Sequence, residues 1–295
     1  MKRSSCSALD EDIKIEGNDL ATLYIFGDES GTMPINDTDK PFVAATVSVL
    51  GDPPVLIPGS EDDEKMAEIF ANLNIVPFAA VVKPYPGYGK DLNEKYDKIN
   101  VMARATRLIT GASASYLDDR ELREGFDLRN TVWAHAMVQA ISNAVLSTLF
   151  TNPVEAVRVI LDQKTMTPSM RQFFREVIVH RLGEGTKQFL RSFRPTNPAV
   201  VSAWEDRVQF SSKTTMFSWS DESDELQQQF GLRLADRFAR KIYRAQIAGR
   251  PGIVALLEAA GFENFVNDIS GLVTRLDERL VNNFKKKTGL PEPKL

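Results

Sequence analysis

The chain has 295 residues, 43% of them hydrophobic and 26% charged, a composition typical of a globular protein and unlike that of a disordered one. Its 36 lysines and arginines and 40 aspartates and glutamates give a net charge of −4, so a nucleic-acid partner requires a locally basic surface. One cysteine, Cys6, and two histidines, His135 and His180, exclude an internal disulfide and histidine-rich or cysteine-rich metal sites. Any metal chemistry must therefore use oxygen ligands.

The hydrophobic pattern predicts a cytoplasmic protein that does not enter a membrane. The longest apolar runs, such as Phe42–Leu50, are about half of the ~20 residues that a membrane helix needs. The first residues lack the apolar segment of a secretion signal. Because the chain has a single cysteine, we expect a reducing compartment.

Beyond a polar N-terminal arm at residues 1–19, apolar runs of strand length alternate with segments of helical periodicity. Ser60 is expected to cap the first helix, and Pro77 favours an edge position for the third strand. The strands are predicted at residues 20–27, 42–50, 75–82, 154–161 and 207–212, and the helices at residues 61–73, 93–110, 128–150, 167–182 and 226–248.

With the inserted helices set aside, the predicted order is β-β-β-α-β-α-β-α, which is the order of the ribonuclease H fold. We therefore expect an α/β protein with a ribonuclease H-like mixed five-stranded sheet flanked by helices. In this interpretation residues 20–248 form one domain with a helical insertion at about residues 60–126. Residues 249–295 are expected to form a helical C-terminal extension.

Acidic residues follow two of these strands and occur on the last long helix. Strand periodicity places Asp28 and Glu29 on opposite faces of the first strand. In a ribonuclease H-like sheet the site lies across the first and fourth strands, so Asp28 and Asp162 are expected to converge. Helical spacing places Asp236 beside the buried stripe of its helix. Such clustered carboxylates need a divalent cation, and two-metal phosphoryl transfer needs neither histidine nor cysteine.

Each of these acids also has a structural interpretation. The segment Asp28–Gly31 has the composition of a turn that ends a strand. Asp162 is also suited to capping a helix, although the pair at residues 167–168 is the better cap. Asp236 can pair with Arg240 or Arg233 on a solvated helix face.

Three segments resemble the domain of unknown function 3800 family, whose members look like ribonuclease H-fold proteins. Residues 24–31 (YIFGDESG) match its Asp-Glu-Ser-Gly strand end, residues 157–162 (VRVILD) its second acidic strand end, and residues 232–236 (LRLAD) its Gln-x-Ala-Asp helix. Arg233 stands where this family usually has glutamine. The resemblance covers roughly residues 20–248.

This resemblance implies a metal-dependent nuclease that hydrolyses phosphodiester bonds of RNA or DNA at a two-metal carboxylate site. It marks Asp28, Glu29, Asp162 and Asp236 as catalytic acids. Asp28, Asp162 and Asp236 are the implied ligands of Mg²⁺ or Mn²⁺, and Ser30 and Gly31 are implied to shape the turn.

A cluster of basic residues is available for a nucleic-acid partner. Residues 233–250 are rich in arginine and include a single acid. Such a local field can hold phosphates, although the same residues are also typical of a solvated helix face. The candidate nucleic-acid contacts are Lys164, Lys213, Arg233 and Arg240. A second copy of the chain or a regulatory protein is a further candidate partner.

Two other functions compete with the nuclease. The first is a non-catalytic nucleic-acid-binding or scaffold protein of the same fold, because Arg233 departs from the family pattern and a fourth acid is not evident. The second is an actin-like ATP-binding protein, because residues 27–32 loosely resemble a phosphate loop. The chain has no second glycine-rich phosphate loop, which weakens the ATP-binding interpretation.

Overall fold

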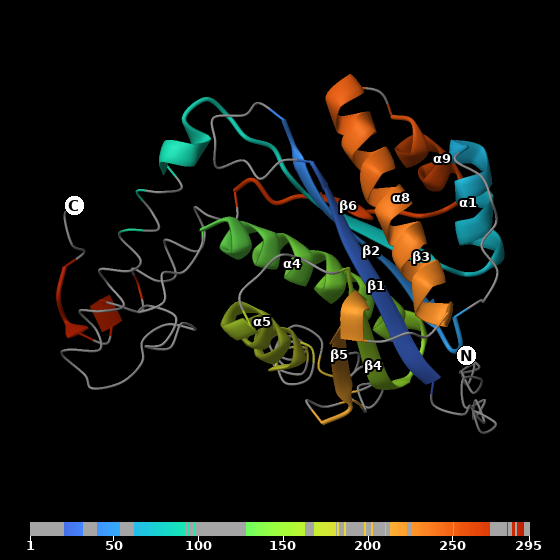
Figure 1. The fold of residues 1–295 in the computed structure, drawn as a ribbon, viewed down its shortest axis with the longest axis horizontal. Coiled ribbons are helices and arrows are strands. Elements are labelled where there is room, and N and C mark those ends of the chain that lie inside the picture. The colour runs from blue at the N-terminus through green and yellow to red at the C-terminus, as the bar shows by residue number, and fades with distance from the viewer. Residues whose placement is uncertain are drawn as a thin grey trace, which may run out of the picture.

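The computed structural model describes residues 21–31, 40–53, 62–91, 128–162, 168–180, 213–222, 226–249 and 251–271, together with a few isolated positions. In this part of the chain a mixed six-stranded sheet carries helices on both faces (Figure 1). The protein is therefore an α/β protein. Among the described helices, none combines the length and the apolar character needed to cross a membrane.

The elements follow one another along the chain with the sheet at the centre. The strands are β1 (Ala21–Gly31), β2 (Phe42–Leu50), β3 (Val76–Val82), β4 (Val154–Leu161), β5 (Thr215–Trp219) and β6 (Val266–Asp268). The helices are α1 (Asp63–Asn72), α4 (Leu128–Thr151), α5 (Pro168–His180), the short 3₁₀ turn η2 (Ser220–Glu222), α8 (Leu226–Ala248) and α9 (Ile253–Ala259).

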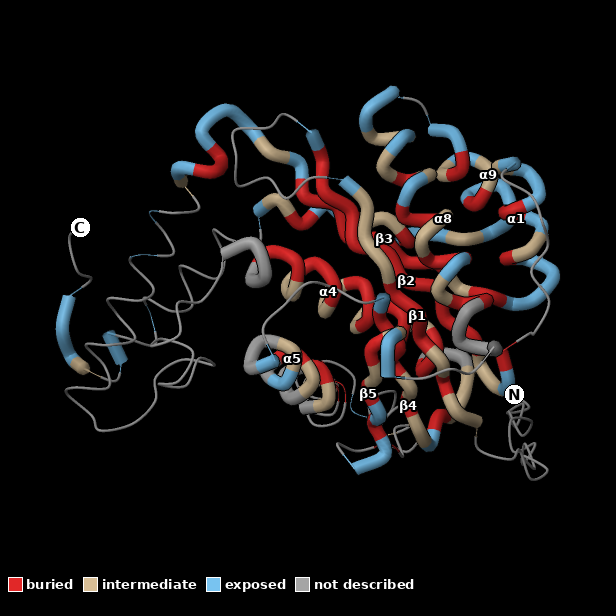
Figure 2. The backbone as a smooth tube through the Cα atoms, viewed as in Figure 1, coloured by how far each residue is buried: buried red, intermediate tan, exposed pale blue. Residues whose placement is uncertain are grey.

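The strands lie in the order β5-β4-β1-β2-β3-β6. β1, β2 and β3 pair in antiparallel fashion, whereas β4 is parallel to β1, β5 is parallel to β4 and β6 is parallel to β3. The central strands are buried along most of their length (Figure 2). Because β1, β4 and β5 run in the same direction, their carboxyl ends meet at one edge of the sheet.

The two faces of the sheet carry different helices. α8 covers β1 and β2 on one face, and α4 packs on β2 and β3 on the other (Figure 1). Glycines allow close approach on both sides, because a Cβ atom on Gly27 would lie 2.9 Å from the sulfur of Met137 in α4. On the opposite face, a Cβ atom on Gly231 of α8 would collide with the ring of Phe26. Both glycines are needed for the packing distance rather than for an unusual backbone conformation.

Several predicted elements are confirmed by the structure. The predicted strands at residues 42–50 and 154–161 and the helix at residues 226–248 have the observed bounds. The long helix ends one residue later than expected, at Thr151, and α5 begins at Pro168. In these segments the hydrophobic period, the strand-breaking residues and the tertiary packing all agree.

The fifth strand does not have the predicted bounds. Phe210, the one described residue of the predicted segment 207–212, lies outside any strand, and a turn at residues 213–214 precedes β5, which begins at Thr215. Thr215, Phe217 and Trp219 are buried and the residues between them are more exposed, the alternation of a half-buried strand. The sequence of residues 207–212 contains β-favouring residues. Residues 215–219 combine an alternating pattern with parallel pairing to β4, which explains why the strand forms there.

The C-terminal region also differs from the expectation of helices alone and of a five-stranded sheet. It contains α9 and then β6, which extends the sheet beside β3. β3 is therefore not an edge strand, and Pro77 is tolerated because β6 begins to pair at Ala79, beyond the missing N–H. The cap of α1 is Asp62, which accepts a hydrogen bond from the N–H of Glu64, and not Ser60. The N-terminal arm and most of the predicted helix at residues 93–110 lie outside the described residues.

Candidate functional site

Three polar residues lie side by side where the parallel pairing of β1, β4 and β5 ends. Gly27 of β1, Leu161 of β4 and Trp219 of β5 form one row of the sheet. Asp28, Asp162 and Ser220 directly follow this row. The N–H of Asp162 donates to the carbonyl oxygen of Gly27 at 3.0 Å, so the pairing of β1 and β4 continues to the acids. Neighbouring strands lie about 4.8 Å apart, so the two acids occupy neighbouring backbone positions.

The two aspartates lie on the face of the sheet that α8 covers. Gly27 faces α4, where the side chains of Leu161 and Met137 surround its α-carbon. Since side chains alternate along a strand, the residues after Gly27 and Leu161 point to the opposite face. Asp28 and Asp162 therefore share the face of α8, as the strand period and the predicted neighbouring of the first and fourth strands required.

The two carboxylates accept different hydrogen bonds. Oδ1 of Asp28 accepts a hydrogen bond from the N–H of Glu29 at 2.7 Å, and the residue is half-buried. Asp162 is exposed, and its Oδ1 accepts a hydrogen bond from the hydroxyl of Ser220 at 2.9 Å. Asp162 therefore presents a carboxylate at an accessible position.

The structure does not bring Glu29 to these acids. Its Oε2 accepts a hydrogen bond from the indole N–H of Trp133 in α4 at 2.7 Å. Trp133 is completely buried, so this bond lies between the sheet and α4. The prediction that Asp28 and Glu29 face opposite ways is consistent with this contact, and it separates Glu29 from the other implied catalytic acids.

Asp236 lies on the helix that passes over Asp28. α8 contacts Phe26 at Gly231 and Gly31 at Tyr243, so Asp236 lies in the stretch between these two contacts. Its neighbours Ala235 and Ala239 are buried, and its own side chain is 31% exposed. Oδ1 of Asp236 pairs with Nε of Arg240 at 2.8 Å, which is one of the two ion pairs expected from the sequence.

The expectation that the first strand ends at residue 27 and that Ser30 and Gly31 shape a turn is wrong: both are the last residues of β1 and pair with β2. Gly31 has a φ angle of +99°, a conformation that favours glycine, and a Cβ atom there would lie 2.7 Å from the ring of Tyr243. Ser30 is half-buried beside it at the end of β1. Gly31 thus permits both the end of the strand and the close approach of α8.

The donor chemistry of this site fits a hard divalent cation. Carboxylate and hydroxyl oxygens are the available groups, and Mg²⁺ is commonly held by one or two carboxylates together with water and substrate phosphates. Asp28 and Asp162 supply such a pair on one face. Within the described ranges, no group of three or more histidine, cysteine, aspartate or glutamate side chains is arranged to hold a metal ion. Asp236 is thus not assembled with the other two.

The predicted nucleic-acid contacts do not all gather near this edge. Arg233 and Arg240 are exposed on α8, the helix that covers Asp28. Lys213 is exposed in the turn before β5, which is the end of that strand remote from Asp162. Lys164 lies outside the described residues. The arginines of α8 are therefore the candidates that flank the carboxylates.

Tyr88 and Asp268, whose pKa values are shifted, lie near the β3–β6 edge of the sheet. Burial is the largest influence on Tyr88 and, with nearby Tyr85 and Asp268, raises the pKa of this phenol to about 12. Partial burial acts to raise the pKa of Asp268, but hydrogen bonds from Ser270 and the charge of Lys83 outweigh it and lower the value. These groups stabilise the β3–β6 edge and are separate from the strand-end acids.

Sequence reasoning missed Ser220 and the tryptophans behind it. Ser220 follows β5 as Asp162 follows β4, but placing the strand at residues 207–212 left this serine in a loop. The alternation of residues 215–219 was the signal that could have identified it. Trp133 and Trp219 stack with their ring centroids 5.9 Å apart, a contact between distant segments that no local pattern reveals.

Comparison of the chain with models of protein families finds no match, and a search of curated proteins finds none either.

Proposed function

We propose that this protein is a metal-dependent nuclease that hydrolyses phosphodiester bonds of RNA or DNA. The observation that carries the proposal is the placement of Asp28 and Asp162 on neighbouring parallel strands, directly after their last paired residues and on the same face of the sheet. Two carboxylates on neighbouring strands are suited to Mg²⁺ or Mn²⁺, which prefer oxygen ligands. When bound, such a cation activates water and stabilises the leaving oxygen of a phosphodiester.

The strand order supports a ribonuclease H-like fold as part of the proposal. In that fold, three antiparallel strands are followed in the sheet by two parallel ones, and the order β3-β2-β1-β4-β5 with the observed directions agrees with this scheme. β6 is an addition at the edge beside β3. Together with the Asp28–Gly31 motif, this order supports membership of the domain of unknown function 3800 family.

Within the proposed site, each acid has a separate task. Asp28 and Asp162 would hold the cation from the sheet, and Asp236 on α8 would join them if its side chain left Arg240. Breaking this ion pair costs little free energy, because an exposed pair four residues apart on a helix contributes only about 0.3–0.5 kcal/mol. Glu29, bound to Trp133 on the other face, supports the fold of the strand end.

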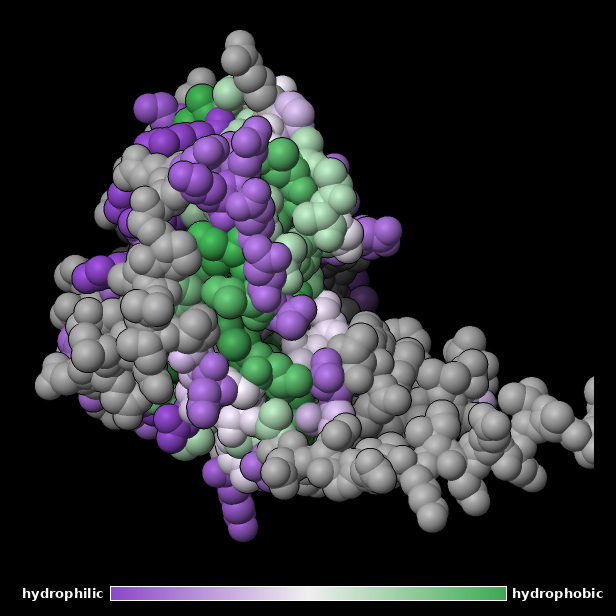
Figure 3. Space-filling view, turned by 90° about the vertical axis from the view of Figure 1, so that its right-hand side faces the viewer, coloured by the Kyte–Doolittle hydropathy of each residue, from purple (hydrophilic) through white to green (hydrophobic). Residues whose placement is uncertain are grey.

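The basic residues of α8 supply the nucleic-acid contact in this proposal. Arg233, Arg237, Arg240 and Arg244 recur every three or four residues and thus follow one side of the helix. Hydrophilic residues form a band down the side of the molecule on which α8 lies (Figure 3). Such a row attracts phosphates locally although the whole chain has a net charge of −4. A cytoplasmic location, expected for a chain with one cysteine, completes the proposal.

The test is a cleavage assay on labelled single-stranded and duplex RNA and DNA, with Mg²⁺ or Mn²⁺. Asp28→Asn and Asp162→Asn are expected to reduce cleavage at least about 100-fold, because each removes a cation ligand. Glu155→Gln is the matched control, since Glu155 is an exposed acid at the other end of β4. This control variant should cleave as the wild type does.

Each variant is purified in parallel with the wild type, so that a contaminating nuclease is recognised by its persistence. Equal cleavage by the wild type and Asp162→Asn would reject the catalytic assignment. Thermal unfolding of each preparation shows whether a loss of activity reflects the site or the fold.

A non-catalytic nucleic-acid-binding or scaffold protein is the second candidate. It is favoured by the pairing of Asp236 with Arg240 and by the lack of a three-ligand acidic group within the described residues. This alternative predicts nucleic-acid binding that is unchanged in Asp28→Asn and independent of divalent cations. A filter-binding titration with and without Mn²⁺ distinguishes it from the nuclease.

A further inference from the structure

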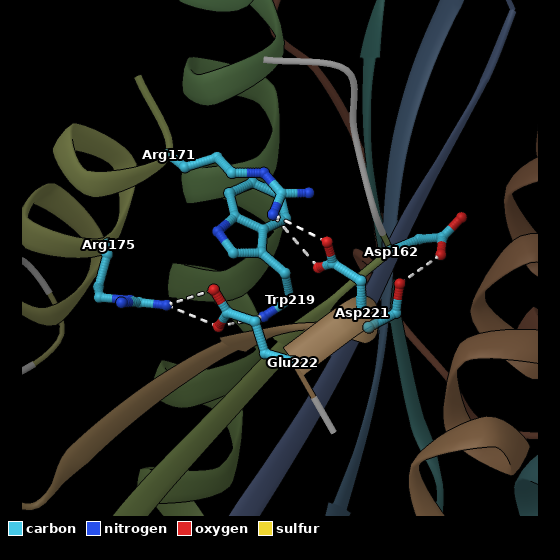
Figure 4. Close-up of polar contacts among 7 residues, drawn as sticks. Asp162, Arg171, Arg175, Trp219, Asp221 and Glu222 are labelled. Atoms are coloured by element: carbon cyan, nitrogen blue, oxygen red, sulfur yellow. Dashed lines mark hydrogen bonds and ion pairs between the residues drawn. The ribbon is translucent and has the colours of Figure 1, made fainter. Parts of the chain in front are cut away.

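Two arginines of α5 form ion pairs with acidic residues of the turn that follows β5. Nη1 of Arg171 lies 2.9 Å from Oδ2 of Asp221, and Nη2 of Arg175 lies 2.6 Å from Oε2 of Glu222 (Figure 4). Nη2 of Arg175 also contacts Oε1 of Glu222 at 2.8 Å. The two arginines lie one helical turn apart on α5, and their acidic partners are adjacent residues of η2. We call these four residues the arginine clamp.

The arginine clamp also fixes the end of β5 itself. The guanidinium of Arg171 lies over the ring of Trp219 at 5.2 Å from its centroid, and that of Arg175 lies 6.0 Å from the centroid of Phe217. Oε2 of Glu222 additionally accepts the backbone N–H of Trp219 at 3.1 Å. Trp219 is fully buried and stacks on Trp133 of α4. The turn is therefore attached to both helices on this face.

Ser220 stands between this rigid turn and the carboxylate site. It directly follows Trp219 and precedes Asp221, so its backbone position is set by residues held on both sides. Its hydroxyl reaches the other face and donates to Oδ1 of Asp162 at 2.9 Å. In Figure 4 the carboxylate of Asp162 points away from Arg171 and Arg175. Ser220 thus links the turn held by the clamp to Asp162.

We propose that Ser220 is a positioning residue for Asp162 and that the arginine clamp holds it in place. The inference rests on the proposed cation site. A hydrogen bond to Oδ1 restricts the rotation of the Asp162 carboxylate, and Oδ2 has no hydrogen-bonding partner among the described residues. Groups that orient a ligand in this way commonly affect metal affinity strongly.

The clamp has an electrostatic consequence as well. Asp221 and Glu222 lie close in sequence to Ser220 and carry the type of group that also binds divalent cations. Their pairing with Arg171 and Arg175 neutralises both acids and directs them to the α5 side. Both acids are thereby directed away from the face that carries Asp28 and Asp162.

Calorimetric titration of the full chain with MnCl₂ tests the inference without relying on activity. Ser220→Ala should weaken Mn²⁺ binding about tenfold because it removes the donor to Asp162. Ser220→Thr, which retains a hydroxyl, should bind within about twofold of the wild type. Ser218→Ala is the matched control, because Ser218 lies two residues earlier on β5 and should not alter the affinity.

Thermal unfolding accompanies each titration, and Ser220→Cys replaces Ser220→Ala if the alanine variant fails to fold. A thiol is a weak donor, so the cysteine variant should also bind Mn²⁺ more weakly. If Mn²⁺ binding depends on Asp162 but is unchanged in Ser220→Ala, the positioning role is overturned and the cation site stands. If the wild type and Asp162→Asn bind Mn²⁺ equally, the cation site itself is overturned.

Discussion

The two faces of the sheet differ at the carboxyl ends of β1 and β4. On the α8 face, Asp28 is half-buried and its carboxylate accepts a backbone N–H. Asp162 is exposed and its carboxylate accepts the hydroxyl of Ser220. On the α4 face, Glu29 is bonded to the buried indole of Trp133, which stacks on Trp219. Acids that are adjacent in sequence thus lie in opposite environments because of the two-residue period of a strand.

This contrast separates residues that hold the fold from residues available for chemistry. A buried polar group needs its partner, since losing it leaves a desolvated donor or acceptor. An exposed carboxylate with spare acceptor capacity contributes little to stability and can bind a cation. Substitutions on the α4 face are therefore expected to affect stability, and substitutions on the α8 face to affect cation binding.

Trp133→Ala gives the largest expected effect on stability. The side chain is fully buried and contacts Phe174, Trp219 and Glu29, so its removal leaves a large cavity between α4, α5 and the sheet. We expect a loss of about 3–5 kcal/mol in the free energy of unfolding, measured by urea titration. Asp162→Asn should stay within about 0.5 kcal/mol of the wild type. A similar loss in both variants would contradict the distinction between the faces.

Gly231→Ala tests the packing of α8 that positions Asp236 over Asp28. A Cβ atom would collide with the ring of Phe26, and we expect a destabilisation of about 1–3 kcal/mol because a well-packed site is overfilled. Gly271→Ala is the control, since nothing lies within 4 Å of a Cβ atom at that glycine. Equal urea midpoints for the two variants would show that α8 does not approach β1 as described.

Much of the fold follows from local patterns that the packing reinforces. The strands β2 and β4 and the helices α4 and α8 have strong apolar periods and well-marked ends, so their bounds were predicted closely. β5 and β6 were missed because they are short and depend on β4 and β3 for their pairing. Tertiary pairing determines such strands more than their own composition does.

For the candidate site, periodicity predicts the directions of side chains within an element but not the contacts between elements. Strand alternation gave the opposite directions of Asp28 and Glu29, and helical spacing gave the pair of Asp236 with Arg240. The contact of Ser220 with Asp162 joins residues on different strands, and it follows from the register of β5 against β4. Register of this kind depends on the whole sheet and has no local signature.

Arg240→Gln gives the smallest expected effect. It removes the ion pair with Asp236. Because the Arg240 side chain is 62% exposed, the free energy of unfolding should fall by only about 0.3–0.5 kcal/mol. Replicate urea titrations can resolve whether the change exceeds 1 kcal/mol. A loss that large would mean that Asp236 is held as firmly as Glu29 and belongs with the residues that maintain the fold.

Anomalous diffraction from crystals soaked in MnCl₂ shows directly whether Asp28 and Asp162 bind a cation. We expect a peak on the α8 face, within about 2.0–2.6 Å of carboxylate oxygens of both residues. The peak should be absent from crystals of Asp162→Asn. A peak that contacts neither aspartate, or none at saturating Mn²⁺, would contradict the assignment of these two residues to a cation site.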